Sequence, residues 1–304
     1  MKGLPPALLA VGAAGLSSFL GGSAIVATRF VVPEAGVLPV VFLRFAGAGL
    51  LMLAFTLPRT GQPVKGGDMP ALVGLGLVQF ALFPWLFTSS LALIPAARAA
   101  LVLSTQPLVT LAFAVIAGRE RLTVAKVAGG LLALAAVGFA LSDQLSDTGP
   151  HAWRGDMYMF GAVVSGSLYN VASSFALRRH RARVAGAVMV PVGAVAAGVA
   201  LLWQGEAGTI SQIGASGWLA LAYLMSLGGA VTFFLWIWAL EHTTPSRVAL
   251  AVTLNPVSAA ILGAAVLAEP LGWRLVVGLA GIVAALVLVN WHVIAAGLRN
   301  RPGG

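Results

Sequence analysis

The sequence predicts an all-α integral membrane protein with ten transmembrane helices, arranged as two inverted five-helix repeats. Two observations lead to this fold class: the chain is strongly apolar, and a stretch of its first half recurs in its second half. Of the 304 residues, 59% are hydrophobic and only 9% are charged, whereas about a quarter of the residues of a soluble domain are charged. This composition is typical of a chain that lies mostly within a lipid bilayer.

Ten apolar segments are long enough to cross a membrane. Because unpaired backbone groups cannot be left in hydrocarbon, an apolar run of roughly 20 residues must be helical there. The expected spans are 7–28, 38–57, 70–92, 96–117, 124–142, 157–177, 184–204, 216–240, 247–267 and 274–296. The polar segment 143–156 separates a first repeat, 1–142, from a second repeat, 157–304, which includes a short tail.

The recurring stretch shows how the two halves are related. RAALVLSTQPLVTLAFAVIAGRERL at 98–122 aligns without a gap with RVALAVTLNPVSAAILGAAVLAEPL at 247–271, at an offset of 149 residues. The same offset places Ser18 of the first span on Ser167 of the sixth, which argues against the alternative of a cleaved signal peptide. Because five spans are an odd number, the second half would enter the membrane from the opposite side. Inverted repeats of this kind are typical of secondary transporters, whose site lies near the midplane between the halves.

The basic residues predict the orientation. If the N-terminus is cytoplasmic, most lysines and arginines fall in inside connectors, and the outside connectors hold only Arg29, Arg98, Arg154 and Arg274. This asymmetry favours both termini in the cytoplasm. The predicted location is the plasma membrane, as a multi-pass protein of the bacterial inner membrane. The net charge of +9 is therefore interpreted as a topology signal, and no nucleic-acid partner is expected.

The polar side chains argue against an enzyme or a metal site. The chain has no cysteine, and its four histidines are scattered near the ends of spans. Within the spans the polar groups are amides, hydroxyls and one arginine, so no nucleophile and base pair is visible. We expect no metal, no cofactor and no catalytic residue.

Prolines and amides mark the middle of the fourth and ninth spans. Pro107 and Pro256 each remove a backbone donor, so a kink is expected that faces a pathway or is satisfied by a neighbouring helix. Gln106 and Asn255 stand immediately before them. Buried amides are costly without hydrogen bonds, so the pair predicts a shared site, with contacts between helices as the alternative.

Other deep side chains extend this candidate site. Gln79, Tyr169 and Asn170 could instead form hydrogen bonds between helices, and the aromatic residues could instead contact lipid or pack in the bundle. Aromatic residues share one face of the third span and one face of the eighth: Phe80, Phe83 and Phe87, then Phe233 and Trp236. The candidate substrate-binding residues are Gln79, Gln106, Tyr169, Asn170, Trp236 and Asn255.

Charged residues near the spans have two interpretations. Arg98 and Arg247, at helix N-termini, either extend to headgroups or capture a carboxylate at the cavity mouth, and we count them with the prolines as gating or kink residues. Arg44 lies deeper and is expected to extend outward or to pair with an acid. Glu120 and Glu269 close the repeated motif, and we interpret them as structural.

Three motifs carry a resemblance to a known family. FLRFAGAGLLML at 42–53 and the paired AGRERL (117–122) and LAEPL (267–271) resemble the EamA-type repeats of the drug/metabolite transporter superfamily, over nearly the whole chain. The resemblance implies a ten-helix exporter of amino acids or related small metabolites, with a cavity built mainly from helices 1, 3, 4, 6, 8 and 9. A nucleotide-sugar or drug carrier of the same superfamily is the alternative. The expected partners are a small-molecule substrate and the lipid bilayer.

One feature of related transporters is missing from this sequence. Small multidrug-resistance relatives have a membrane-buried glutamate in the first helix, whereas the polar groups within this helix are Ser17, Ser18 and Ser23. A carboxylate-driven antiport of that type is therefore not expected.

Overall fold

The structure, a computed structural model, describes residues 6–56, 66–91, 93–94, 96–140, 142, 152–258 and 273–299. Within these ranges the chain forms helices and turns and no strand. The first half contains α1 (Pro6–Ala35), α2 (Val37–Thr56), α3 (Met69–Leu77), α4 (Phe83–Leu91), α5 (Ala96–Leu103), α6 (Gln106–Ile116) and α7 (Val124–Ala140). The second half contains α8 (Ala152–Ala176), α9 (Ala182–Gln204), α10 (Ala215–Met225), α11 (Thr232–His242), α12 (Pro245–Leu250) and α14 (Trp273–Arg299).

Five helical segments are long and apolar enough to cross a membrane. They are Pro6–Ala35, Val37–Thr56, Met69–Ser90, Ala182–Trp203 and Ala215–His242. Shorter apolar helices cover Leu101–Ile116, Val124–Ala140 and Val276–Trp291. The protein is thus an all-helical, multi-pass membrane protein, and the count of ten spans and their inverted relation stay predictions.

Helix α8 is long but carries more polar residues than those five segments. Its serines and its asparagine are accommodated because this face is buried in the bundle: Ser165, Ser167, Asn170 and Ser173 are at most 5% exposed. Thr110 of α6 donates a 3.0 Å hydrogen bond to Ser167. Ser167 and Asn170 therefore find partners in neighbouring helices, whereas Ser165 and Ser173 donate to carbonyls of α8 itself. These hydrogen bonds offset part of the desolvation of the buried polar groups.

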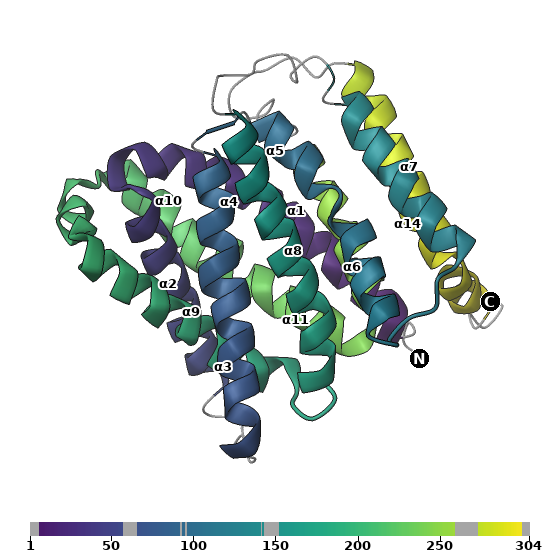
Figure 1. Cartoon of the computed structure of the whole chain (residues 1–304), viewed down its shortest axis with the longest axis horizontal. Coiled ribbons are helices and arrows are strands. Elements are labelled where there is room, and N and C mark those ends of the chain that lie inside the picture. Colours follow the sequence, from purple (N-terminus) through teal and green to yellow (C-terminus); the bar gives the residue numbers. More distant parts are fainter. Residues whose placement is uncertain are drawn as a thin grey trace, which may run out of the picture.

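Helices α7 and α14 lie side by side at one edge of the bundle, far apart in sequence (Figure 1). Glycines permit their close approach, because a Cβ on Gly129 would lie 2.3 Å from the Val289 side chain and one on Gly278 would lie 2.5 Å from that of Ala140. Small residues of this kind are enriched where membrane helices pack closely.

Two π-helical segments interrupt long helices in the two halves. Val78–Leu82 joins α3 to α4, and Ser226–Val231 joins α10 to α11. The repeat offset of 149 places residue 78 on residue 227, so the two segments fall at matching positions of the sequence. A π-helical turn widens the backbone locally and is frequent at functional sites.

Helical regularity is also lost just before each amide–proline pair. Helix α5 ends at Leu103, and α6 begins at Gln106 after a two-residue turn. In the second half, α12 ends at Leu250 and a 3₁₀ turn, Ala251–Leu254, precedes Asn255. Proline is well suited to the first turn of a helix, where its missing N–H has no partner in any case.

Candidate functional site

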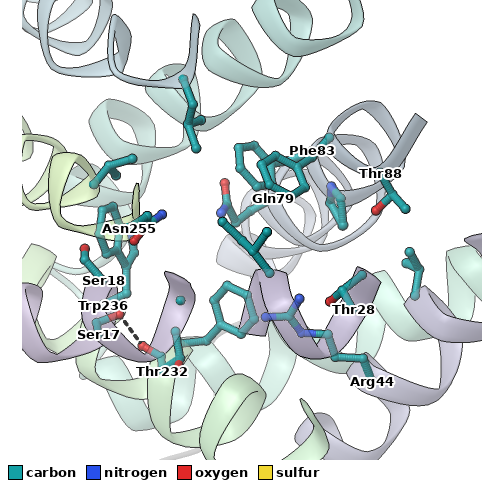
Figure 2. A pocket seen from close by; sticks show the side chains of 18 of the residues that line it. Ser17, Ser18, Thr28, Arg44, Gln79, Phe83, Thr88, Thr232, Trp236 and Asn255 are labelled. Atoms are coloured by element: carbon teal, nitrogen blue, oxygen red, sulfur yellow. Dashed lines mark hydrogen bonds between the residues drawn. The ribbon is translucent and has the colours of Figure 1, made fainter. Parts of the chain in front are cut away.

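A cavity of about 130 Å³ lies inside the bundle. Its walls come from α1, α2, the π-helical segment Val78–Leu82, α4 and the α5–α6 break in the first half, and from α11 and residues 252 and 255 in the second. Elements on both sides of the 143–156 connector therefore enclose a single space (Figure 2).

Close contacts hold α1 against the second half beside this cavity. A Cβ on Gly22 would lie only 2.3 Å from the carbonyl oxygen of Asn255, so a larger residue would force the two backbones apart. Ser17 Oγ donates a 2.8 Å hydrogen bond to the carbonyl of Thr232. The first residues of α11 and the region around Asn255 are thereby fixed against α1.

Aromatic rings form much of the cavity lining. Phe45 and Phe233 lie with their ring centroids 5.4 Å apart, and Phe83 and Phe87 stack at 5.8 Å. Trp236 completes the lining, and its Nε1 donates a 3.0 Å hydrogen bond to Asn170 Oδ1. The cavity thus offers flat apolar surfaces to a ligand, as small-molecule sites commonly do.

Several polar atoms at the cavity are buried without a partner in the part of the chain that the structure describes. They are Ser18 Oγ, Gln79 Oε1 and Asn255 Oδ1, and all three residues line the cavity. Buried polar atoms normally have partners. These acceptors are therefore available to a bound molecule.

Arg44 is the single charged residue among the described residues that line the cavity. Its Nη2 donates a 2.6 Å hydrogen bond to the carbonyl of Gly228, in the second π-helical segment. Its Cζ lies 5.5 Å from the ring centroids of both Phe45 and Phe233, and its Nε has no partner among the described atoms. Figure 2 shows the Arg44 side chain pointing from the edge of the cavity toward the middle of its lining residues.

The outward orientation expected for Arg44 was wrong, because the side chain lines the cavity and donates a hydrogen bond to Gly228. Arg44 forms no ion pair with an acid in the described ranges. The signal that indicated its importance was present in the sequence, since a charged residue deep in a span is by default a functional candidate. Hydropathy gives the depth of a residue, but it does not give the face of the helix on which it lies.

The structure brings four of the six candidate binding residues to the cavity: Gln79, Gln106, Trp236 and Asn255. Tyr169 and Asn170, both on α8, lie behind this lining. Tyr169 is fully buried with its ring 5.9 Å from that of Phe80. Helix α8 contributes none of the described lining residues, whereas α2 contributes four, although the expected cavity omitted α2.

None of the gating and kink candidates whose side chains the structure describes is among the lining residues of the cavity. Pro107 is buried in the first turn of α6, and Pro256 follows the lining residue Asn255. Arg247 is in α12, and its Nε has no partner among the described atoms. The side chain of Arg98 lies outside the described residues. Roles in gating therefore stay predictions for all four residues.

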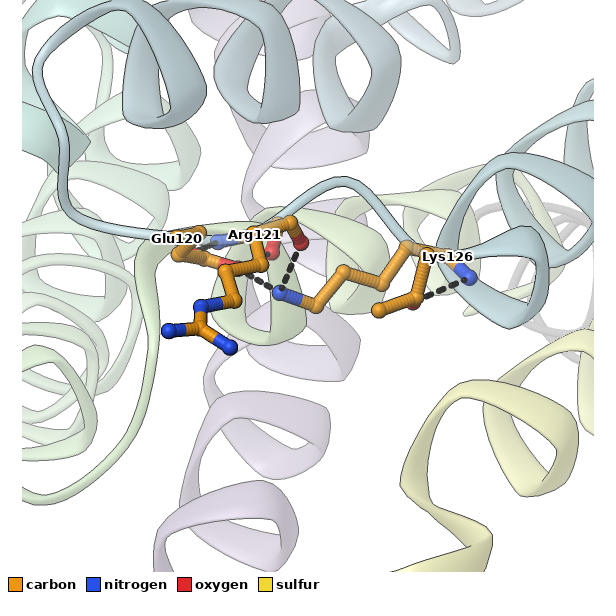
Figure 3. A network of polar contacts seen from close by, with 5 residues as sticks. Glu120, Arg121 and Lys126 are labelled. Atoms are coloured by element: carbon orange, nitrogen blue, oxygen red, sulfur yellow. Dashed lines mark hydrogen bonds and ion pairs between the residues drawn. The ribbon is translucent and has the colours of Figure 1, made fainter.

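Glu120 connects the two halves through Ser246, and neither residue lines the cavity. Figure 3 shows the Glu120 side chain beside Lys126. Its carboxylate accepts a 3.0 Å hydrogen bond from the Ser246 backbone N–H, accepts another from the Ser246 hydroxyl, and lies 2.5 Å from Lys126 Nζ. The side chain is only 1% exposed. This geometry agrees with a structural role, while Glu269 lies outside the described residues.

The fold and the cavity define a polytopic helical membrane protein with an internal cavity lined by both halves of the chain. The chain belongs to the EamA-like transporter family, whose model matches residues 8–142 and again residues 153–291. This confirms the resemblance seen in the sequence motifs, and the protein is a membrane transporter of this family.

Individual relatives agree with this membership, and a solved structure shares the fold. An uncharacterized inner membrane transporter, YedA, of Escherichia coli K12 is 26% identical over 252 residues, covering 82% of this chain and 79% of that protein. An uncharacterized transporter of Archaeoglobus fulgidus is 24% identical and covers 90% of this chain and 94% of the relative. A solved structure described only as that of a protein has the same fold, with a TM-score of 0.77 at 21% identity, and the match covers 94% of this chain and 98% of that one.

Proposed function

We propose that the protein is a secondary transporter that exports a small carboxylate-bearing metabolite, of the amino-acid class, by alternating access. Ten helices in two inverted repeats would rock around the cavity and open it to each side of the membrane in turn. Three observations support this mechanism: both halves line the cavity, the family model matches the two halves separately, and π-helical segments occur at matching positions.

The observation that carries the substrate class is Arg44. A guanidinium in a cavity without a carboxylate among the described lining residues favours a ligand that supplies the negative charge. The unpartnered oxygens of Gln79, Asn255 and Ser18 would then accept hydrogen bonds from an ammonium group. A zwitterionic amino acid provides both groups in one molecule.

The size of the cavity favours an amino acid over a nucleotide sugar. About 130 Å³ is below the roughly 300–1,000 Å³ of pockets for drug-sized ligands. A nucleotide sugar also carries a diphosphate, and a single described arginine would leave part of its charge uncompensated. The aromatic lining from Phe83, Phe87 and Trp236 suits a molecule with an apolar side chain.

The proposal is tested by counterflow in proteoliposomes with matched probes. L-leucine, L-leucinamide and 4-methylpentanoate share their branched carbon chain, but leucinamide lacks the carboxylate and 4-methylpentanoate lacks the ammonium group. We expect leucine to compete best and leucinamide to compete least. If no probe from a wider amino-acid panel is exchanged by the wild-type protein, the proposed substrate class is wrong.

The variant Arg44→Gln should weaken competition by leucine about tenfold to a hundredfold, because a hydrogen bond to a charged group contributes about 1.5–3 kcal/mol. It should leave leucinamide nearly unchanged, whereas Arg44→Lys should retain part of the preference. Arg154→Gln is the matched control, because the Arg154 guanidinium lies against Trp153 at the start of α8, with Cζ 5.4 Å from the ring centroid, and does not line the cavity. An equal loss for leucine and leucinamide in Arg44→Gln would contradict the charge-recognition role.

A further inference from the structure

A second hollow lies between α3 and α8, separate from the cavity. This groove has a volume of about 670 Å³ and shares no lining residue with the cavity. Its walls are apolar along most of their length, with Ala71, Leu72, Leu75 and Val78 on one side and Leu168, Ala172, Phe175 and Ala176 on the other. Leu168 and Phe175 are 49% and 50% exposed, so the groove opens to the outside of the bundle.

Charged residues gather at one end of this groove, where α3 begins and α8 ends. Asp68 accepts a 2.8 Å hydrogen bond from Arg179 Nη1 and lies 3.0 Å from His180 Nε2. These two contacts hold the pKa of Asp68 below its ordinary value. The acid is thus already engaged by Arg179 and His180, and it does not compensate the other two cations of the groove, Arg119 and Arg178.

Arg119 and Arg178 form no ion pair with an acid in the described ranges. The Arg119 guanidinium lies over the Phe175 ring of α8, with Cζ 3.3 Å from the ring centroid, and its Nε is buried without a partner among the described atoms. Burial and then the positive charge of Arg178 lower the pKa of Arg119. Two cations are therefore held close together at the end of an apolar groove, an arrangement that an anion would stabilise.

We propose that this groove binds an anionic phospholipid, whose phosphate contacts Arg119 and Arg178 and whose acyl chain lies between α3 and α8. The apolar walls argue for a lipid rather than free phosphate, because phosphate alone would leave the groove below the arginines empty. A zwitterionic headgroup would add a cation to a site that already holds two, so an anionic headgroup is preferred. The basic end is also the end at which the sequence places the membrane–water interface on the cytoplasmic side.

The experiment uses the purified full-length protein in detergent micelles, titrated with phosphatidylglycerol, with phosphatidylcholine, or with inorganic phosphate. Bound lipid is counted by native mass spectrometry, and the melting temperature is recorded on the same samples. We expect phosphatidylglycerol to bind and to raise the melting temperature, with a preference over phosphatidylcholine that falls as salt is added. Equal binding of the two lipids, or a full shift with inorganic phosphate alone, would overturn the proposal.

Two variants separate the charge from the apolar groove. Arg119→Gln combined with Arg178→Gln should weaken phosphatidylglycerol binding about thirtyfold, at roughly fivefold for each arginine near an anionic group. Ala172→Phe should block the acyl chain while keeping both arginines, and should also reduce lipid binding. Arg154→Gln, the control at the other end of α8, should bind phosphatidylglycerol as the wild type does.

The proposal can be tested even if a variant fails to fold. The lipid preference of the wild-type protein, and the dependence of that preference on salt, already show whether an anionic headgroup is recognised. Phosphatidylglycerol binding that is unchanged in the folded double variant would assign the lipid to another surface and overturn the inference.

Discussion

The indole N–H of Trp236 on α11 donates a 3.0 Å hydrogen bond to Oδ1 of Asn170 on α8. Trp236 lines the cavity, whereas Asn170 lies behind it and is 1% exposed. A residue that does not line the cavity therefore fixes the orientation of one that does. Because the two helices belong to the same half, we expect this contact to be kept while the halves move against each other.

Replacement of Asn170 by leucine should misorient the Trp236 ring and destabilise the protein. The indole N–H would be left buried without an acceptor, at a cost of about 1–3 kcal/mol. The measurement is a double-mutant cycle with Trp236→Phe, which removes the donor, read by unfolding free energy and by probe affinity. Interhelical side-chain hydrogen bonds average about 0.6 kcal/mol, so we expect a coupling energy near that value, and strictly additive effects would show that the contact does not hold the ring.

Gln106 and Asn255 should contribute to substrate affinity more than to folding. Gln106→Met and Asn255→Leu keep most of the side-chain volume but remove the amide, so each should weaken binding about tenfold to a hundredfold. Affinity and melting temperature are to be measured on the same purified variants. Asn290→Leu is the matched control, because this buried amide of α14 donates a 2.9 Å hydrogen bond to Leu286 and does not line the cavity. Normal affinity with lowered stability in Gln106→Met would place that amide among the structural contacts.

The orientation is testable because the chain has no cysteine. With both termini in the cytoplasm, Arg181→Cys should be protected in intact cells from an impermeant thiol reagent, while Asp147→Cys, which lies outside the described residues, should react. Permeabilised cells provide the control that both positions are reactive when exposed. Labelling at 181 and protection at 147 would reverse the predicted topology.

The helices could be predicted because the lipid bilayer requires long apolar segments, and such segments are visible in the sequence. Segments such as 38–57 are apolar over a bilayer thickness, and the structure has a helix at Val37–Thr56. Helix α8 shows what hydropathy alone does not identify. It is 25 residues long, but it is less apolar than the five long spans. On its polar face, Ser167 contacts Thr110 of α6 and Asn170 contacts Trp236 of α11. Contacts of this kind depend on packing that a single segment does not encode.

The sequence predicted how deep the candidate residues lie in the membrane, but it did not predict the direction in which each side chain points. The paired amides Gln106 and Asn255 were found because costly groups repeated at equivalent positions suggest a shared use. Asn170 looked equivalent to them by depth, yet its side chain meets Trp236. For Arg44 the predicted direction of the side chain was wrong. Its hydrogen bond to Gly228 depends on a π-helical turn that no sequence pattern indicated.

Removal of the Glu120 carboxylate should destabilise the contact between the two halves. The carboxylate accepts hydrogen bonds from the backbone N–H and hydroxyl of Ser246, at the start of α12, and forms an ion pair with Lys126. The first N–H groups of a helix have no partner within it, so Glu120 satisfies one of them from a loop of the first half. Because its side chain is 1% exposed, water does not readily replace it.

We therefore expect Glu120→Gln to lower the unfolding free energy by about 1.5–3 kcal/mol. Glu120→Ala should lower it by about 3–5 kcal/mol, since this variant leaves the Ser246 N–H without its partner and leaves Lys126 with the Arg121 carbonyl but no counter-ion. Lys126→Met is the matched comparison. It removes only the cation, whose side chain is 15% exposed, so the two hydrogen bonds from Ser246 remain and the loss should be smaller. Unfolding in mild detergent, followed by tryptophan fluorescence, ranks the three variants, and a Glu120→Ala curve that coincides with the wild type would show that this contact does not stabilise the association of the halves.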